Sequence, residues 1–509
     1  MGEAPSSICF LNRAMAERDL SRAETELAPT LAAPLKSLLA QSPDPDTALR
    51  LLMRYLETAS AEVLRDLPRH PMALTYLVAT FGHSESLGEV FLAHPALPVQ
   101  FARDWHLAEL RSADEVMQDY ARYSVTSPDP WLASQLARFK RRNYLRIALK
   151  DVLGISTLGE TMLELSTVAD VIVKQALAFC DHELENRHGR PQHRDSGGRI
   201  APTGFSVVSL GKLGGGELNY SPHIALLFLY AHSGQTAGGS ESASTISNKE
   251  YCVRLAEAVV RTITQPTPHG EVYRVDSGLR PDSAKGDLAI SLRSALEYYD
   301  HRASDRELHA LVKARHSAGD PRLTRDFIQG IQAYVYRAPF DAEELETTLA
   351  ADQPIAEQSS AGQQRGLGLS LLFRGIRDIE FLAQHLQRLH GGDDPWVRTG
   401  GTMLALRRLN DKGLLTDSEY ARLTSAYEFF RKVEHRLELS EDQAPQSSRA
   451  DDQALRRLAH RAGIQDLANQ DAGVTLITEI TRTSGLVKEI CKQRSRPRAA
   501  PTEGNVSPR

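Results

Sequence analysis

The sequence predicts an α+β fold that is mostly helical, with a small mixed sheet around a glycine-rich hairpin. Apolar residues recur at helical spacing in several long stretches, including 375–390 and 416–440. Strand-like runs gather instead near the middle of the chain. There Phe205–Leu210 alternates and is rich in Val, and Ile224–Tyr230 is almost wholly apolar. We therefore expect a central sheet with a helical region before it and a helical bundle after it.

The division of the chain follows from these patterns. A chain of 509 residues should hold about three domains. The predicted order is an N-terminal helical region (1–145), a core (146–350), a linker (351–365), a C-terminal helical bundle (366–495) and a tail (496–509). The tail is rich in Arg, Pro and Ser and poor in apolar residues, so it is expected to be disordered.

Composition and charge exclude some classes of function. Hydrophobic residues make up 41% and charged residues 25%, and the net charge of −5 argues against nucleic acid as the main partner. No apolar run approaches the ~20 residues that span a bilayer and no secretory signal opens the chain, so no membrane partner is expected. The cysteines are scattered: Cys9, Cys180, Cys252 and Cys491. Without C-x-x-C spacing they indicate reduced thiols and a cytoplasmic location.

The N-terminal elements are expected to be helices. Apolar spacing is helical in 51–67 and 115–123, and 140–172 continues as helices broken at Gly154. A polar segment, 185–199, then predicts a loop. Cysteine and histidine gather near it: Cys180, His182, His188 and His193. They could suggest a metal site, but their spacing matches no zinc pattern, so a solvent-exposed loop is the favoured interpretation.

A glycine-rich connection joins the two central strands. Gly211–Gly216 (GKLGGG) predicts a tight turn, followed by a short connection over 217–221. Glycine permits positive φ and close approach, so the N–H groups of such a turn can cradle a phosphate. The pattern is neither a Walker P-loop nor a G-x-G-x-x-G fingerprint. A plain hairpin connection is the structural alternative.

The remaining elements are placed by the same signals. They are a flexible loop (234–247), a helix (250–262), a strand (272–276), a helical stretch (291–315) and a polar linker (352–364). The loop could act as a lid or be an ordinary surface loop.

Two C-terminal helices are expected to bury one face each. In 375–390 the apolar stripe is Ile379, Leu382, Leu386 and Leu389, and in 416–440 it is Tyr427, Phe430, Val433 and Leu437. The run Glu434-His435-Arg436 is expected to form a solvated or a domain-packing face, with His435 as a catalytic base the less favoured alternative.

Several motifs occur in an ordered series. They are GKLGGGELN (211–219), VYRVDSGLRP (272–281), KAR (313–315), GIRDIEFLAQ (375–384) and YEFFRKVEHRL (427–437). In this order and spacing the chain resembles the bacterial glutamine synthetase adenylyltransferase/deadenylylase family, which belongs to the polymerase-β-type nucleotidyltransferase superfamily. The resemblance runs from about Arg141 to about Gly463, and more loosely back to about Phe81.

The resemblance implies a metal site that this chain does not complete. Such enzymes hold Mg²⁺ on an Asp-x-Asp pair and a third carboxylate. The pair falls on His223 and Ala225, and the third carboxylate on Asp276. Ala225 offers no donor atom and His223 is a poor Mg²⁺ ligand. A loss of several orders of magnitude in rate is therefore expected.

The resemblance also implies the other site residues. The residues implied to bind ATP, or ADP and phosphate in the reverse direction, are Gly211, Lys212, Gly214, Gly215, Glu217, Asn219, Arg280, Lys313 and Arg315. The residues implied to be catalytic are Asp276, Arg377 and Glu380. As alternatives, Lys313 and Arg315 could be exposed helix charges, and Asp378 with Glu380 could complement a helix N-terminus.

Three hypotheses for function follow. The first is a nucleotidyltransferase that adenylylates or de-adenylylates a tyrosine of glutamine synthetase with ATP and Mg²⁺, and the shared motifs leave the direction open. The second is a non-catalytic pseudoenzyme that binds nucleotide, glutamine synthetase or a PII-type signalling protein. In the third, His223 and Ala225 were introduced into an active enzyme.

Overall fold

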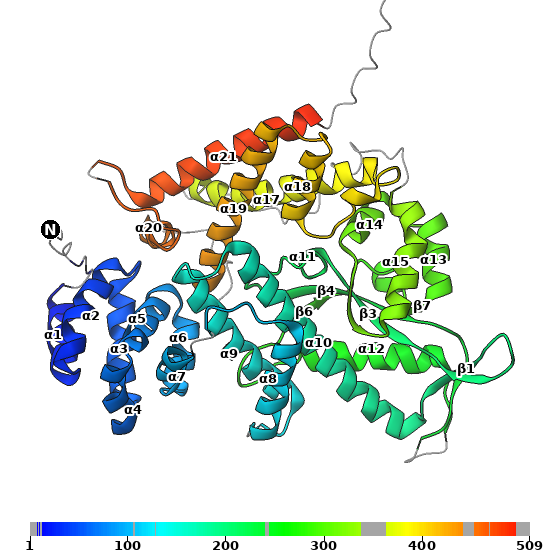
Figure 1. The fold of residues 1–509 in the computed structure, drawn as a ribbon, viewed down its shortest axis with the longest axis horizontal. Helices are drawn as coiled ribbons and strands as arrows, with labels where there is room; N and C mark the ends of the chain where they lie inside the picture. Colours follow the sequence, from blue (N-terminus) through cyan, green and yellow to red (C-terminus); the bar gives the residue numbers. More distant parts are fainter. Residues whose placement is uncertain are drawn as a thin grey trace, which may run out of the picture.

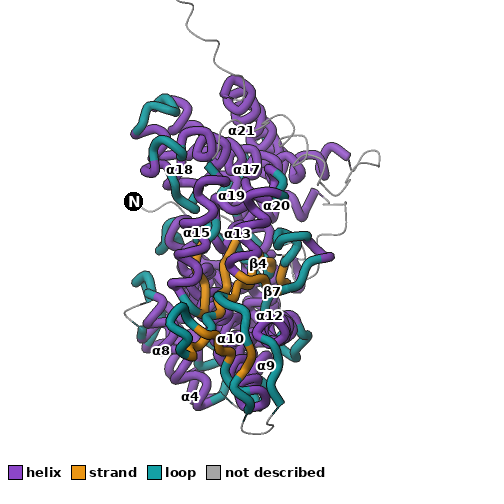
Figure 2. The backbone as a smooth tube through the Cα atoms, turned by 90° about the vertical axis from the view of Figure 1, so that its right-hand side faces the viewer, coloured by secondary structure: helices purple, strands orange, loops and turns teal. Residues whose placement is uncertain are grey.

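Helices surround two small sheets in this protein. The computed structural model describes residues 8, 10, 13–104, 107–127, 129–239, 244–336, 363–440, 452–467 and 469–494. Figure 1 shows the N-terminal helices in blue at one end, the sheets in green, and the C-terminal helices in orange and red packed across the top. Figure 2, turned by 90°, shows the strands lying among the helices. The mostly helical α+β prediction is confirmed.

The N-terminal part is a stack of short helices. They are α1 (Arg13–Glu26), α2 (Pro29–Gln41), α3 (Pro45–Thr58), α4 (Ala61–Asp66), η1 (Leu67–Arg69), α5 (Met72–His83), α6 (Glu85–Ala93), α7 (Leu97–Arg103) and α8 (Ala113–Thr126). The stretch 51–67 is not one helix, because α3 ends at Thr58 and the Ser60 side chain accepts from the Val63 N–H to begin α4.

Two long helices carry the chain from this stack to the sheet. They are α9 (Leu132–Val152) and α10 (Leu158–His188), and Gly154 between them has φ +67°, as expected for the predicted break. The buried carboxylate of Glu164 on α10 pairs with Arg146 and Lys150 on α9, which locks the two helices together. Helix α9 runs without a break through residue 145, the predicted end of the N-terminal region.

The five-stranded sheet has the order β6-β4-β3-β8, with β7 also paired to β4. Its strands are β3 (Phe205–Leu210), β4 (His223–Tyr230), β6 (Arg274–Asp276), β7 (Ala289–Ser291) and β8 (Arg315–Gly319). Strands β3 and β4 pair antiparallel, which confirms the predicted hairpin, whereas β6 and β7 run parallel to β4. The central position of β4 explains its continuous apolar sequence.

Helices cover both faces of this sheet. Leu226 and Phe228 of β4 pack with α10 and α12 (Asn248–Thr264), while Leu227 and Leu229 pack on the other side. The second face is covered by α13 (Leu292–His301) and α15 (Pro321–Val335). Alternation along the strand therefore divides the core into two layers.

The polar segment predicted as a loop contains regular structure. Helix α10 continues to His188, and the chain then forms β1 (Pro191–Arg194) and β2 (Ile200–Pro202). With β5 (Gln235–Thr236) they make a second sheet of order β2-β1-β5. The loop prediction for 185–199 was wrong because backbone pairing, reinforced by Asn248 donating to the Gln192 carbonyl, needs no apolar pattern.

The prediction for 291–315 was only partly right. Helix α13 is followed by α14 (Asp305–Ala310) and the 3-10 turn η3 (Leu311–Lys313), after which Arg315 begins β8. A second 3-10 turn, η2 (Ser283–Lys285), precedes β7. Charged residues at helical spacing do not distinguish a helix from a turn that enters an edge strand.

The C-terminal bundle has its own core. It consists of α17 (Gln363–His390), η4 (Pro395–Val397), α18 (Thr402–Asp411), α19 (Asp417–Ser440), α20 (Asp452–Arg461) and α21 (Ala472–Arg494). Three residues of the predicted α17 stripe are buried, but Leu389 is 43% exposed in the last turn of the helix. Most of the predicted linker and all of the predicted tail lie outside the described residues. No described helix is both long and apolar enough to cross a bilayer.

Candidate functional site

The glycine-rich connection is a short helix, not a simple turn. Residues Gly211–Gly214 form α11 between β3 and β4. Gly214 lies so close to the end of η3 that a Cβ atom at position 214 would be 2.1 Å from the carbonyl oxygen of Lys313. The tight-turn prediction therefore missed the helical geometry, although the need for glycine at a close backbone approach holds.

Arg315 supports this helix from the side. Its Nη2 donates to the Leu213 carbonyl at 2.8 Å and its Nε to the Gly214 carbonyl at 3.3 Å, while Nη1 lies 2.8 Å from Oδ2 of Asp170. Arg315 is thus placed at the end of the glycine connection by hydrogen bonds to its backbone. The alternative of an exposed helix charge is wrong for this residue, since it begins β8.

A buried ion network joins the hairpin to the C-terminal bundle. The Lys313 Nζ donates to Glu217 Oε2 at 3.1 Å and lies 3.6 Å from Glu380 Oε2. The Thr402 N–H also donates to Glu217, and its hydroxyl donates to Oε2 at 2.9 Å. The side chain of Lys313 is only 3% exposed, so the alternative of a surface charge is wrong here too. These residues come from η3, the hairpin, α17 and the start of α18.

Arg431 extends the network along α19. It is fully buried, donates to the Glu217 carbonyl at 2.7 Å, and lies 3.7 Å from Glu380 and 3.0 Å from Glu434. The Tyr427 hydroxyl donates to Glu380 at 3.0 Å. Burial alone would raise the pKa of Glu380, but Lys313 and Arg431 outweigh it and lower that pKa. Glu380 is therefore held as a carboxylate.

Lys212 connects α11 directly to the same helix. Its Nζ lies 2.7 Å from Glu434 Oε1, and the Lys212 side chain is 32% exposed while that of Glu434 is 3% exposed. Burial would raise the pKa of Glu434, but the charges of Lys212 and Arg431 prevail and lower it to about 2. The ammonium of Lys212 is thus the part of this network that reaches toward solvent.

The end of the hairpin is bound by a second carboxylate of α19. The Asn219 amide donates to Glu438 Oε1 at 2.5 Å, and the Ser221 N–H donates to Oε2 at 3.2 Å. Burial and the nearby charge of Glu434 raise the pKa of Glu438 to about 8, despite the opposing charge of Lys212. Glu438 therefore retains a proton at a pH where exposed glutamates are ionised.

The raised pKa of Glu438 predicts a pH-dependent contact between the hairpin and α19. The folded chain binds one more proton than the unfolded chain between about pH 4.5 and pH 8, so the free energy of unfolding should fall as pH rises through this window. In thermal denaturation at pH 6, 7, 8 and 9, the melting temperature of Glu438→Gln should fall less steeply with pH than that of the unmodified chain. Glu428→Gln, on an exposed position of the same helix, should keep the original slope. Equal slopes in the two variants would refute the prediction.

The positions expected to hold a metal lie on β4 and β6. In the parallel pairing Ala225 is opposite Asp276, and His223 is opposite Arg274. His223 and Asp276 are both exposed. The Asp276 carboxylate accepts from the Gly278 N–H at 2.7 Å, and His223 Nδ1 lies 2.9 Å from the Ser221 hydroxyl. Asp276, the third carboxylate of the implied metal site, therefore lies opposite the methyl side chain of Ala225.

This donor set does not fit the Mg²⁺ site that the resemblance implies. Mg²⁺ requires hard oxygen ligands in octahedral geometry, and of the three positions only Asp276 supplies a carboxylate. Burial, together with the charges of Arg274 and Lys212, lowers the pKa of His223, which leaves a neutral nitrogen donor. Within the part of the chain that the structure describes, no three His, Cys, Asp or Glu side chains could jointly hold a metal ion. That finding includes His182, His188 and His193.

Two further predicted residues have other surroundings. Arg280 donates to the Ser277 carbonyl at 2.8 Å and to the Gly286 carbonyl at 3.2 Å, which shapes the loop after β6. Arg377 is partly buried on α17, one turn before Glu380. Because α17 begins at Gln363, residues 377–380 lie far from its N-terminus. The proposed interaction of Asp378 and Glu380 with a helix N-terminus is therefore wrong.

Helix α19 is also anchored to the N-terminal half. Arg436 donates to both carboxylate oxygens of Asp151 at 2.6 and 2.8 Å, and Tyr220 donates to the same carboxylate at 3.1 Å. His435 is 1% exposed and lies 3.7 Å from Asp151. The run Glu434-His435-Arg436 therefore forms a domain-packing face, and the solvated alternative is wrong.

Part of this site was not predicted from the sequence. Thr402, Arg431 and Glu438 were not identified, and Tyr427 was expected only as an apolar core residue. A signal was available, because Tyr427, Arg431, Glu434 and Glu438 follow spacings of four, three and four residues and so share one face of α19. Polar residues along one helix face predict a polar interface, but not its partner.

Comparison with known proteins adds the family context. Residues 74–330 match the family model for glutamate-ammonia ligase adenylyltransferase, and residues 375–494 match that for GlnD PII-uridylyltransferase. The buried ion network thus connects the two matched segments.

The curated relatives are bifunctional glutamine synthetase adenylyltransferase/adenylyl-removing enzymes. The one from Thioalkalivibrio sulfidiphilus is 31% identical over 419 residues, 82% of this chain and 42% of the relative. Those from Streptomyces avermitilis (30% over 471 residues, 90% and 43%) and Pseudomonas aeruginosa (29% over 443 residues, 86% and 44%) are similar. The chain spans less than half the length of these relatives.

Proposed function

This chain belongs to the glutamate-ammonia ligase adenylyltransferase family, and we propose that it is a nucleotidyltransferase module that acts on glutamine synthetase with impaired catalysis. In the reaction proposed, a tyrosine hydroxyl of glutamine synthetase attacks the α-phosphorus of ATP, and pyrophosphate leaves. In the reverse direction, a phosphate oxygen attacks the phosphorus that joins AMP to the tyrosine, the tyrosine oxygen leaves and takes up a proton, and ADP is formed. Regulation of nitrogen assimilation would be the outcome of either reaction.

The proposed impairment of catalysis rests on one observation. Ala225 stands opposite Asp276 at the position where the resemblance implies a carboxylate, so no oxygen ligand faces Asp276 from β4. Bound Mg²⁺ would polarise phosphoryl oxygens and stabilise the attacking and leaving groups, but the residues present do not fit it. The polar groups of the site would position a nucleotide, with Lys212 the most solvent-exposed cation of the network. Positioning without a metal clamp supports binding better than phosphoryl transfer.

The second candidate is a non-catalytic regulator. The ion network supports it, because Lys313 and Arg431 are engaged by buried carboxylates that keep the hairpin and the bundle in one arrangement. The match of 375–494 to a PII-uridylyltransferase supports a PII-type protein as its partner. As such a regulator, the chain binds glutamine synthetase, nucleotide or a PII-type protein, and it regulates through binding alone, without a chemical reaction.

Binding can be measured separately from catalysis. Isothermal titration of the chain with glutamine synthetase, and with ATP, should show saturable binding of at least one of them at micromolar to millimolar dissociation constants. Lys212→Met should weaken ATP binding about tenfold or more, since it removes the most accessible cation of the network. The exposed Lys412→Met should leave it unchanged. Absence of binding to both ligands would refute the catalytic form, and absence of binding to a PII-type protein as well would refute the regulatory form.

A further inference from the structure

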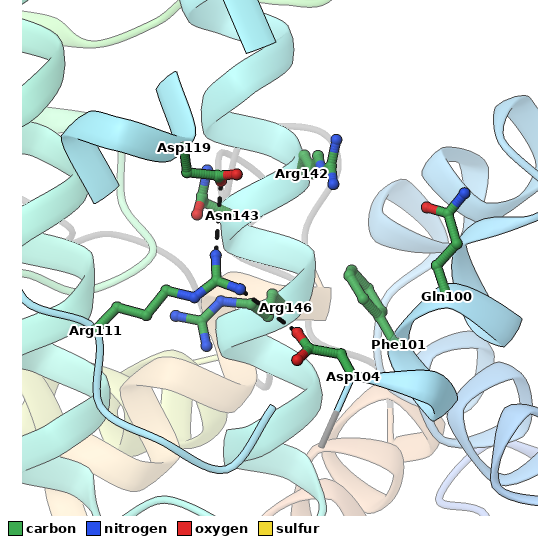
Figure 3. Close-up of a pocket in the computed structure, with 8 residues that line it drawn as sticks. All are labelled: Gln100, Phe101, Asp104, Arg111, Asp119, Arg142, Asn143 and Arg146. Carbon is green, nitrogen blue, oxygen red and sulfur yellow. Dashed lines mark ion pairs between the residues drawn. The ribbon is translucent and has the colours of Figure 1, made fainter. Parts of the chain in front are cut away.

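A cavity of about 120 Å³ lies in the N-terminal half, and none of its lining residues belongs to the glycine hairpin. It is bounded by α7, by the segment leading into α8, by α8 itself and by the middle of α9. Figure 3 shows its lining, which is Gln100, Phe101, Asp104, Arg111, Asp119, Arg142, Asn143 and Arg146. Three guanidinium groups therefore border one small space.

Arg146 forms the buried wall of this cavity. Its side chain is 3% exposed, and its Nη2 donates to Glu164 Oε1 at 2.5 Å. Its Nε and Nη1 are buried and have no hydrogen-bond partner among the residues that the structure describes. A buried donor without a partner costs about 1–3 kcal/mol, and more when the group is charged. Such donors therefore require an acceptor that the described part of the chain does not supply.

The other two arginines leave room for the same acceptor. Arg111 Nη2 lies 3.5 Å from Asp104 Oδ2 and its Nη1 lies 3.6 Å from Asp119 Oδ2, which is longer than a good hydrogen bond. Figure 3 shows the Arg111 and Arg146 guanidinium groups close together, with Arg111 directed toward Asp104 and Asp119. Arg142 is exposed at the cavity edge and forms no ion pair with any residue that the structure describes.

The charges around the cavity do not balance. Among the described residues that line it, Arg111, Arg142 and Arg146 stand against Asp104 and Asp119, which leaves one positive charge in excess. A monoanion would neutralise it. A carboxylate or phosphate also matches the planar fork of a guanidinium group, which donates two parallel hydrogen bonds to such oxygens.

We propose that this cavity is a binding site for a small oxyanion, a carboxylate or a phosphate, held by Arg111, Arg142 and Arg146. The volume limits the ligand to a few heavy atoms, because a cavity of roughly 150 Å³ accommodates benzene. The site is distinct from the metal and nucleotide positions on β4 and α11, and its occupancy does not depend on catalysis. Ordered water is the competing occupant.

The test uses the whole chain with inorganic phosphate and acetate as separate probes, each against sodium chloride at equal ionic strength. Thermal denaturation and isothermal titration should show binding of at least one probe, with a melting temperature that rises with its concentration. Which probe binds distinguishes a phosphate site from a carboxylate site. Absence of any rise beyond the chloride control with both probes would show that the cavity holds only water.

Substitutions of the cavity arginines test whether the anion binds at this site. Arg142→Ala removes an exposed side chain and should fold normally, and it should weaken binding at least tenfold. Arg146→Lys keeps a cation beside Glu164 but removes the planar fork, and it should weaken binding to a similar extent. Arg122→Ala, at an exposed position of α8 outside the cavity, is the matched control and should bind like the unmodified chain. Unchanged binding in Arg142→Ala would overturn the assignment, whether or not Arg146→Lys folds.

Discussion

The double replacement His223→Asp with Ala225→Asp is expected to raise Mg²⁺-dependent AMP transfer by at least about 1,000-fold, equivalent to roughly 4 kcal/mol of transition-state stabilisation. Residues 223 and 225 project from the same face of β4, because side chains alternate along a strand. An aspartate at 225 would stand opposite Asp276 on the adjacent strand, with backbones about 4.8 Å apart. Three carboxylates could then share the metal ions.

Label transfer from ATP to glutamine synthetase, and phosphate-dependent release of AMP from modified glutamine synthetase, would measure both directions. The double replacement by Asn matches the size of the new side chains without their charge and should remain inactive. Adding Asp276→Asn to the Asp variant should abolish the gained activity. A gain that persists in the presence of EDTA would contradict the proposed role of the carboxylates.

Lys313→Met is expected to destabilise the chain by about 3–5 kcal/mol, the usual penalty for removing one partner of a buried ion pair. The substitution leaves the carboxylates of Glu217 and Glu380, 5% and 19% exposed, without their shared cation. It also removes the donor to Thr402. Urea denaturation followed by circular dichroism would measure the loss.

The matched control is Lys412→Met, which removes a lysine from the exposed pair with Asp394. Exposed pairs contribute about 0–1 kcal/mol, so this variant should unfold near the unmodified chain. Equal midpoints for Lys313→Met and Lys412→Met would show that the buried network does not hold the hairpin to the bundle.

Much of the fold could be predicted from the sequence because its strongest signals are local. The alternation in Phe205–Leu210 and the apolar run in Ile224–Tyr230 gave the two central strands, and both are confirmed. The break at Gly154 and the buried stripe of α19 are local signals too. The strand β1 was missed because its side chains after Pro191 are polar, and β2 because it is only three residues long. Both are stabilised by pairing, β2 with β1 and β1 also with β5.

The site was harder to predict because its contacts join residues far apart in the chain. Lys313 meets Glu217 across 96 positions, and Arg431 reaches the Glu217 carbonyl across 214. Spacing within a motif gives the residue types but not their partners. The family motifs identified Lys313, Glu217 and Glu380 as site residues, and the structure brings these three together in one buried network. Their roles in binding nucleotide and in catalysis stay predictions.

The most direct test of the catalytic proposal is a single-turnover assay of the unmodified chain. The chain is held in excess over glutamine synthetase with radiolabelled ATP and Mg²⁺, and label on the tyrosine is followed for hours beside the double Asp variant. With one metal-binding carboxylate of three, the unmodified chain should transfer no label above the chain-free blank while the variant does. Metal-dependent labelling by the unmodified chain at a rate within tenfold of the variant would contradict the impaired site.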